Sequence, residues 1–136
     1  YARVAKINVA SQSVELIKEI CPFPKGIAVS RDNKNLFVTR FITEADSGEI
    51  YMLDALTLDV MKTIKIAPEY TIDSEFGGKG VSNYLNSITL SPDGRTALML
   101  AKKDNVFRGL QRDGSPLNFE NTVRAAMGFI NLSTRQ

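Results

Sequence analysis

The sequence predicts an all-β protein built from repeated four-stranded antiparallel sheets. Short alternating runs rich in β-branched and aromatic residues recur along the chain, whereas helical periodicity is poor throughout. Turn-forming residues separate these runs. The runs also repeat in a fixed order at two independent spacings, which indicates repeated structural units rather than unrelated strands.

The first repeat is a pair of strands joined by a tight turn. GIAVSRDN at residues 26–33, followed by NLFVT at 35–39, matches SITLSPDG at 87–94, followed by TALML at 96–100. In the second copy Pro92 presets the turn and Gly94 supplies the positive φ of a tight hairpin. Asn33 stands in the place of Gly94 in the first copy, and Asn tolerates positive φ better than other non-glycine residues. We therefore expect the same turn in both copies.

The second repeat is the strand pair at residues 3–8 and 14–20, which recurs at 49–54 and 60–66. A further copy of its first strand stands at residues 127–132. A repeating antiparallel unit of four strands and about 40 to 50 residues is typical of a β-propeller blade. We predict that residues 1–136 are part of one β-propeller domain and contain about two and a half blades. Residues 2–20 would form strands c and d of one blade, residues 23–66 a complete blade, and residues 83–136 strands a, b and c of the next. A β-sandwich with accidental similarity between its strands is the alternative.

The residues of these repeats resemble a known family. PKGIAVS at 24–30 and SPDGRT at 91–96 are similar to the GIAVSPDGKxLYV signature of YVTN-family propeller repeats, and GEIYMLD at 48–54 resembles the next strand of that repeat. FVTR at 37–40 departs from the usual YVTN, as does ALML at 97–100. Residues 102–125 resemble an insertion in bacterial cell-surface YVTN proteins joined to c-type cytochrome, peroxidase-like modules. The resemblance implies a periplasmic, cell-surface or secreted bacterial protein. It also implies haem c in an adjoining domain or partner, with no cofactor in this chain.

Composition excludes several functions. The net charge is +2, and Lys and Arg are interleaved with Asp and Glu, so we expect no nucleic-acid partner. The chain has no histidine and one cysteine, which excludes a Ser-His-Asp triad, an internal disulfide and a CxxCH haem-attachment motif within it. We expect Cys21 to be a small buried apolar residue rather than a reactive thiol. No apolar run approaches the roughly 20 residues of a membrane-spanning helix.

A propeller ring leaves no sheet edge unpaired only when it closes. A closed ring needs at least about four blades, whereas the strands predicted here make up about two and a half. The predicted partners are therefore the remaining propeller blades, from the same polypeptide or from other chains. The family resemblance implies a c-type cytochrome as a further partner.

Connection lengths predict which end of the propeller binds a partner. The a–b and c–d turns at residues 31–34, 55–59 and 92–95 are short, whereas the other connections, at 41–47, 67–84 and 103–124, are long. All long connections should emerge on one face, around the mouth of the central channel, and long loops on a rigid scaffold commonly bind. A basic patch there would dock a haem propionate or an acidic protein surface. The alternative is a loop held to itself by ion pairs. The partner-binding candidates are Arg40, Lys79, Tyr84, Lys102, Lys103, Asp104, Asn105, Arg108, Arg112 and Arg124.

Other patterns do not indicate a site. GGKG at 77–80 lacks the GxxxxGK[ST] spacing and the following helix of a phosphate-binding loop, so it is interpreted as a connector. The oxygen-bearing residues Asp46, Asp73, Glu75 and Asp104 lack the spacing of a calcium loop, and we predict no metal site. We also predict no catalytic residue. The leading hypothesis is a non-catalytic binding or scaffold propeller acting beside a c-type cytochrome or peroxidase-like electron-transfer module. The alternatives are a structural or adhesive cell-surface propeller with no redox partner, and an enzyme whose active site lies on another blade.

Overall fold

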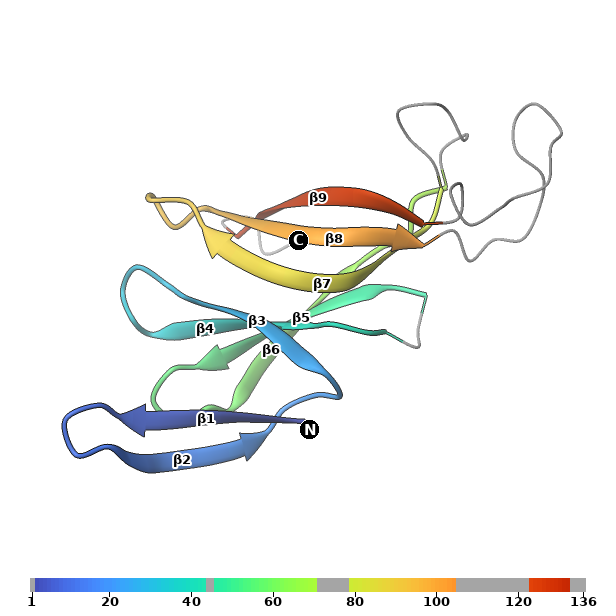
Figure 1. Ribbon diagram of the computed structural model, residues 1–136. Coiled ribbons are helices and arrows are strands. Elements are labelled where there is room, and N and C mark those ends of the chain that lie inside the picture. The colour runs from blue at the N-terminus through green and yellow to red at the C-terminus, as the bar shows by residue number, and fades with distance from the viewer. Residues whose placement is uncertain (1, 44–45, 71–78, 105–122, 133–136) are drawn as a thin grey trace, which may run out of the picture.

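The computed structural model describes residues 2–43, 46–70, 79–104 and 123–132, and no helix occurs among them. These residues form three antiparallel sheets (Figure 1). The first sheet pairs β1 (Arg3–Asn8) with β2 (Ser13–Glu19). The second has the order β3 (Pro24–Val29), β4 (Asn35–Arg40), β5 (Gly48–Asp54) and β6 (Val60–Ile66). The third contains β7 (Val81–Leu90), β8 (Thr96–Asp104) and β9 (Val123–Asn131). The predicted fold class, an all-β partial propeller with four-stranded antiparallel blades, is confirmed.

Strands of the third sheet are longer than the sequence suggested. β7 begins at Val81, inside the connection expected at residues 67–84, and Val81, Ser82 and Asn83 pair with β8. β8 and β9 stay paired as far as Asp104 and Val123, with Lys103 opposite Arg124. Lys102, Lys103 and Arg124 therefore lie in strands, and the prediction that they belong to a loop was wrong. Alternating side chains of a strand point to opposite faces, so charged residues can extend a ladder while their side chains stay at its surface.

The a–b turns repeat in atomic detail. Ser30 donates to Asp32 at 2.6 Å, and Ser91 donates to Asp93 at 2.6 Å. In both turns the same aspartate oxygen also accepts a backbone N–H two residues later. Asn33 has φ of 57° and Gly94 has φ of 71°, which confirms that Asn takes the left-handed role of Gly in the first copy.

The c–d turns repeat in the same way. The side-chain oxygens of Asn8 and Asp54 each accept the backbone N–H groups of the residues two and three positions later, at 2.8 to 3.1 Å. The residue four positions after each, Gln12 and Leu58, has positive φ of 55° and 58°. Asn and Asp favour this local hydrogen bonding, which ends the strand and starts the turn.

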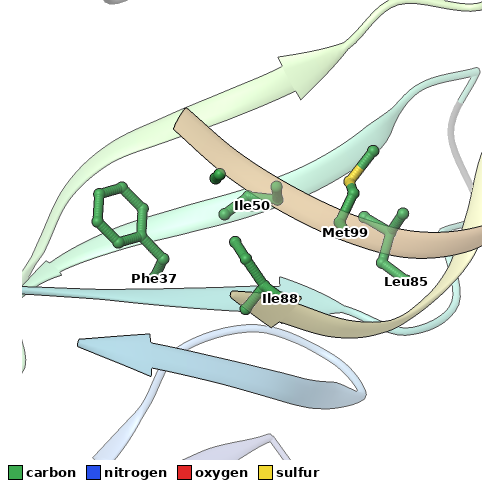
Figure 2. Close-up of a cluster of buried hydrophobic side chains, with 6 residues drawn as sticks. Phe37, Ile50, Leu85, Ile88 and Met99 are labelled. Atoms are coloured by element: carbon green, nitrogen blue, oxygen red, sulfur yellow. The ribbon is translucent and has the colours of Figure 1, made fainter. Parts of the chain in front are cut away.

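The hydrophobic core lies between the second and third sheets. Figure 2 shows Phe37 and Ile50 from β4 and β5 beside Leu85 and Ile88 from β7 and Met99 from β8. Leu85 and Ile50 are fully buried. Burial of each such side chain contributes about 1.5–3 kcal/mol, so this cluster is the main apolar contact that fixes the two sheets together.

A buried hydroxyl joins the innermost strands of these sheets. Thr39, which is fully buried, accepts from the N–H of Gly26 at 2.8 Å and donates to the carbonyl of Leu85 at 2.7 Å. A Cβ at Gly26 would lie 2.9 Å from Cα of Ser87, closer than side chains approach backbone. The absence of a side chain at Gly26 therefore lets β3 and β7 come together.

Candidate functional site

The connections separate into two ends of the molecule. Figure 1 shows the turns β1–β2, β3–β4, β5–β6 and β7–β8 at one end, and the carboxyl ends of β2, β4, β6 and β8 at the other. We call the second end the long-loop end, since the strands that precede the longer connections finish there. This division follows from up-and-down strand order, and it places several predicted partner-binding residues near one another.

Two aromatic rings and two ammonium groups form a row at the long-loop end. The rings of Phe41 and Tyr84 meet edge to face, with centroids 5.4 Å apart and planes at 79°. Lys25 Nζ lies 5.5 Å from the centroid of Phe41, and Lys102 Nζ lies 5.3 Å from that of Tyr84. Each cation–π contact contributes about 0.5–1 kcal/mol at an exposed site. This cation–aromatic row (Lys25, Phe41, Tyr84 and Lys102) bridges the second and third sheets and holds two positive charges at the surface.

Asn83 positions Tyr84 in this row. Its side-chain oxygen accepts the N–H of Thr43 and the N–H of Tyr84, both at 2.9 Å, and its amide donates to Asp104 at 3.0 Å. Tyr84 has positive φ of 50°, and the β7–β8 register shifts between Asn83 and Ser87. The three hydrogen bonds stabilise this irregular backbone, because they fix the β4–β5 connection, the start of β7 and the end of β8 together.

Asp104 is half-buried behind the row. Burial raises the pKa of its carboxyl, and the hydrogen bond from Asn83 and the charge of Lys102 oppose that shift only in part. One oxygen accepts from Asn83, whereas Oδ1 is buried with no hydrogen-bond partner. Asp104 is thus an acceptor in the support of the row rather than a surface anion.

Arg40 belongs to a separate, mostly buried network. Its guanidinium contacts Glu49 at 3.0 Å and donates through Nε to the carbonyl of Ile42 at 2.9 Å. Tyr51 donates to the same Glu49 oxygen at 2.7 Å. Burial raises the pKa of Glu49, but the hydrogen bonds from Tyr51 and Arg40 outweigh it and leave that pKa below 4.5. Because Glu49 neutralises Arg40, this arginine stabilises the long-loop end and is a poor docking cation.

Cys21 lies close to this network and is buried, as expected. Burial raises the pKa of its thiol to about 11, with opposing influence from Arg40. A thiol in this environment is protonated at neutral pH and is a poor nucleophile.

The remaining predicted residues divide into two groups. Lys103 of β8 forms an ion pair with Glu69, which follows β6. The backbone of Glu69 also pairs with that of Gly80, the residue after Lys79, so the ion pair connects this segment to β8. Arg124 lies opposite Lys103 in the β8–β9 ladder. Asn105, Arg108 and Arg112 lie outside the described residues, as do Asp73 and Glu75. Sequence reasoning missed Lys25, Phe41 and Asn83. Packing of the second sheet against β7 brings Lys25 and Phe41 to Tyr84. Asn83 precedes Tyr84 in the sequence, but its bonds to Thr43 and Asp104 are non-local.

The other end of the molecule carries a groove between the second and third sheets. Its volume is about 990 Å³. Apolar side chains of β4, β6, β7 and β9 line it, among them Phe37, Ile64, Leu90 and Ile130, and Arg31 and Asp93 stand in its wall. In the described part of the chain no three metal-ligating side chains gather, and no helix is long and apolar enough to span a membrane.

Comparison with known proteins supports the fold. No protein-family model matches the chain, and no curated protein does. A hydrazine synthase chain from Kuenenia stuttgartiensis has a similar structure, with a TM-score of 0.73 and 11% identity over 99% of this chain and 34% of that one. An acylaminoacyl peptidase from Pyrococcus horikoshii is also similar, with a TM-score of 0.56 and 17% identity over 98% of this chain and 19% of that one. This chain thus spans about a third of the length of the first structure and about a fifth of the second, and the likeness shows the fold alone.

Proposed function

We propose that this chain is a non-catalytic β-propeller binding module of an extracytoplasmic bacterial protein that docks a c-type cytochrome or peroxidase-like electron-transfer module. The cation–aromatic row is the observation that carries the proposal. In this proposal haem c belongs to the adjoining domain or partner, and the row contacts the acidic protein surface around the haem edge.

The chemistry of the row suits a transient acidic partner. Lys25 and Lys102 are exposed, and the aromatic rings that they cover are held by packing and by Asn83. Exposed lysines paired with carboxylates would already be neutralised, as Lys103 is by Glu69. Complementary charge chiefly accelerates association and fixes orientation, which is what an electron-transfer encounter requires.

A structural or adhesive surface propeller with no redox partner is the second candidate. The repeats favour it as well as they favour the first, because they specify a scaffold and no ligand. The two candidates differ in whether haem accompanies the native protein and in whether the row contributes to binding.

The first test is the visible absorption spectrum of the native protein that contains residues 1–136. A Soret band with reducible α and β bands, in the polypeptide or in a co-purifying protein, is the result expected from the proposal. A spectrum without absorption above that of the aromatic residues would contradict the redox function and favour the structural candidate.

The second test is charge reversal in the row, measured against the haem protein identified in the first. Lys25→Glu and Lys102→Glu together should slow association about tenfold or more at low salt, and the difference should shrink as salt screens it. Lys34→Glu and Arg95→Glu together make the same change of net charge at exposed positions of the β3–β4 and β7–β8 turns, at the opposite end of the molecule, and should leave the rate within about twofold. Equal effects of the two sets would show that net charge, and not the row, governs association.

A further inference from the structure

The groove between the second and third sheets is a concave apolar site at the end of the molecule opposite the cation–aromatic row. Its lining includes Phe37 of β4, Met52 of β5, Ile64 of β6, Leu90 of β7 and Ile130 of β9. Its volume of about 990 Å³ is at the upper limit of small-molecule pockets, which measure about 300–1,000 Å³ and are mostly apolar with a few polar groups. The groove therefore has the size and the composition of a ligand site.

The groove is formed by the way in which the two sheets pack. β7 lies against β3, β4 and β5, whereas the walls farther out belong to β6 and β9, which carry Ile64 and Ile130. Phe37 lines the groove and also belongs to the buried core with Ile50 and Met99. Because part of the lining is packed core, the groove exists before any ligand binds and keeps its shape.

Arg31 places hydrogen-bond donors in the wall of the groove. Its Nη1 donates to the carbonyl of Pro92 at 3.3 Å, which links the β3–β4 turn to the β7–β8 turn. A guanidinium has five N–H groups, and within the part of the chain that the structure describes this is the one hydrogen bond that the Arg31 side chain makes. An oxygen atom of a ligand could therefore accept a further N–H of Arg31.

The charges in the wall of the groove balance one another. Arg31 and Lys62 carry positive charges, and Asp32 and Asp93 carry negative ones. The pKa of each carboxyl is lowered, chiefly by a hydrogen bond from the serine two residues earlier, so both are ionised at neutral pH. A ligand with a net charge would lose its hydration in the apolar part of the groove and meet a like charge in the wall. The groove therefore favours an uncharged molecule.

From these observations we propose that the groove binds an uncharged, elongated apolar molecule with a hydrogen-bond acceptor at one end, the chemistry of a long-chain alcohol, ester or ketone. The apolar chain lies along Phe37, Ile64 and Ile130, and the acceptor oxygen takes an N–H group of Arg31. This site is separate from the cation–aromatic row and does not depend on a redox partner.

A series of ligands that differ only in the head group tests the chemical class. Nile red, an uncharged dye, is bound to the complete native polypeptide at pH 7 and is then displaced by decan-1-ol, decanoate or decylammonium, each below the concentration at which it aggregates. Decan-1-ol should displace the dye at an about tenfold lower concentration than either ion, because burial of a charge opposes binding of the ions. Equal displacement by all three, stronger displacement by an ion, or no saturable binding of the dye would overturn the proposal.

A substitution that fills the groove tests the location. Ile64→Trp should weaken binding of Nile red and decan-1-ol about tenfold or more, because the indole would occupy the space of the apolar chain. Leu56→Trp, at a 73% exposed position in the β5–β6 turn, is the matched control and should leave binding within about twofold. Unchanged binding in Ile64→Trp would overturn the location.

Neutralising the two carboxylates gives a readout that a folding defect would not produce. Asp32→Asn with Asp93→Asn keeps the side-chain oxygens that accept hydrogen bonds in the turns, and it leaves the wall with a net positive charge. Decanoate should then displace the dye nearly as well as decan-1-ol. Asp54→Asn with Asp59→Asn makes the same change of net charge outside the groove and should preserve the preference for the alcohol. Equal effects of the two pairs would overturn the proposal, because net charge rather than the groove would then select the ligand.

Discussion

Thr39 is a single side chain that connects two sheets through one oxygen atom. Its hydroxyl accepts from the N–H of Gly26 and donates to the carbonyl of Leu85. Because Thr39 is fully buried, water cannot take the place of the hydroxyl in these hydrogen bonds. A hydroxyl that satisfies a donor and an acceptor in a buried site contributes chiefly through the penalty of leaving those groups unsatisfied.

Thr39→Val should therefore lower the free energy of unfolding by about 1–3 kcal/mol, because the isosteric valine leaves the N–H of Gly26 and the carbonyl of Leu85 without partners. Urea unfolding of the native polypeptide measures the difference. Thr39→Ser keeps the hydroxyl and should recover most of the loss. If valine and serine destabilise equally, the methyl group rather than the hydrogen bonds is the source of the stability.

Glu49 makes a second residue-scale prediction, on pH. Its pKa lies below 4.5 in the folded protein, so the folded state binds its proton less readily than the unfolded state does. The resulting stability is fully present above the unfolded pKa and is lost as pH falls through the folded pKa. Carboxyl groups ordinarily titrate with pKa values of about 3.5–4.5, so unfolding is measured between about pH 6 and pH 3. The free energy of unfolding should fall over this interval in the wild type and should change less in Glu49→Gln. Tyr51→Phe removes one donor to Glu49 and should move the loss to higher pH. An unchanged midpoint would show that the positive charges of Arg40 and Lys65 hold the pKa down without Tyr51.

Hairpin turns are the elements whose chemistry the sequence specifies most completely. The Ser30 and Ser91 turns share their side-chain hydrogen bonds, and the residue with positive φ is Asn33 in one and Gly94 in the other. A Cβ at Gly94 would meet only Cβ of Arg31, at 3.9 Å, so space does not restrict this position. Conformation alone therefore determines which residues it accepts.

Gly94→Asn should change the free energy of unfolding by less than about 0.5 kcal/mol, because Asn33 already adopts the same φ in the other copy. Gly94→Val should destabilise by about 1–2 kcal/mol, since a β-branched residue is disfavoured in the left-handed region. Thermal or urea unfolding of the three proteins gives the comparison. A similar loss for Asn and Val would show that the two turns are not equivalent.

The elements that could be predicted from the sequence are those with local causes. The alternation of apolar and polar residues predicted the strands. The turns at Asn33 and Gly94 were predicted from the positive φ that Asn and Gly tolerate. The longer ladder of β8 and β9 was missed because charged residues such as Lys102, Lys103 and Arg124 are more typical of loops. Their pairing across the two strands is non-local, and no local pattern reveals it. The site was predicted only in part. Tyr84 and Lys102 were named, but Lys25 and Phe41 join them through the packing of β3 against β7, which no local pattern encodes.

At the scale of the whole molecule, the described part of the chain leaves a broad apolar face on the third sheet. Leu100, Met127 and Phe129 are 50%, 56% and 72% exposed, and Leu100 pairs with Met127 across β8 and β9. Patches of this kind on a soluble protein usually mark a surface that another structural unit covers. The face lies on the opposite side of the third sheet from the core that packs against β4 and β5.

Residues 1–136 expressed alone should self-associate through this face. Phe129→Lys should reduce the apparent mass in light scattering at a given concentration, because it places a charge at the centre of the apolar patch. Leu56→Lys, at a 73% exposed position in the β5–β6 turn, is the matched control and should have little effect. Equal reduction by both variants would attribute the association to overall charge, and no association at all would show that the face is stable in water.

The packing of β7 also determines how the second and third sheets can move. β7 is the strand of the third sheet whose backbone lies along β3, β4 and β5, and Thr39 fastens it there. Farther out, the groove of about 990 Å³ separates β6 from β9. A rotation of the third sheet about the β7 axis would change the width of this groove, and it would also pull Met99 of β8 away from Phe37 and Ile50. We therefore expect the groove to keep its width as long as the core stays packed, and the Phe41 and Tyr84 rings to keep their spacing with it.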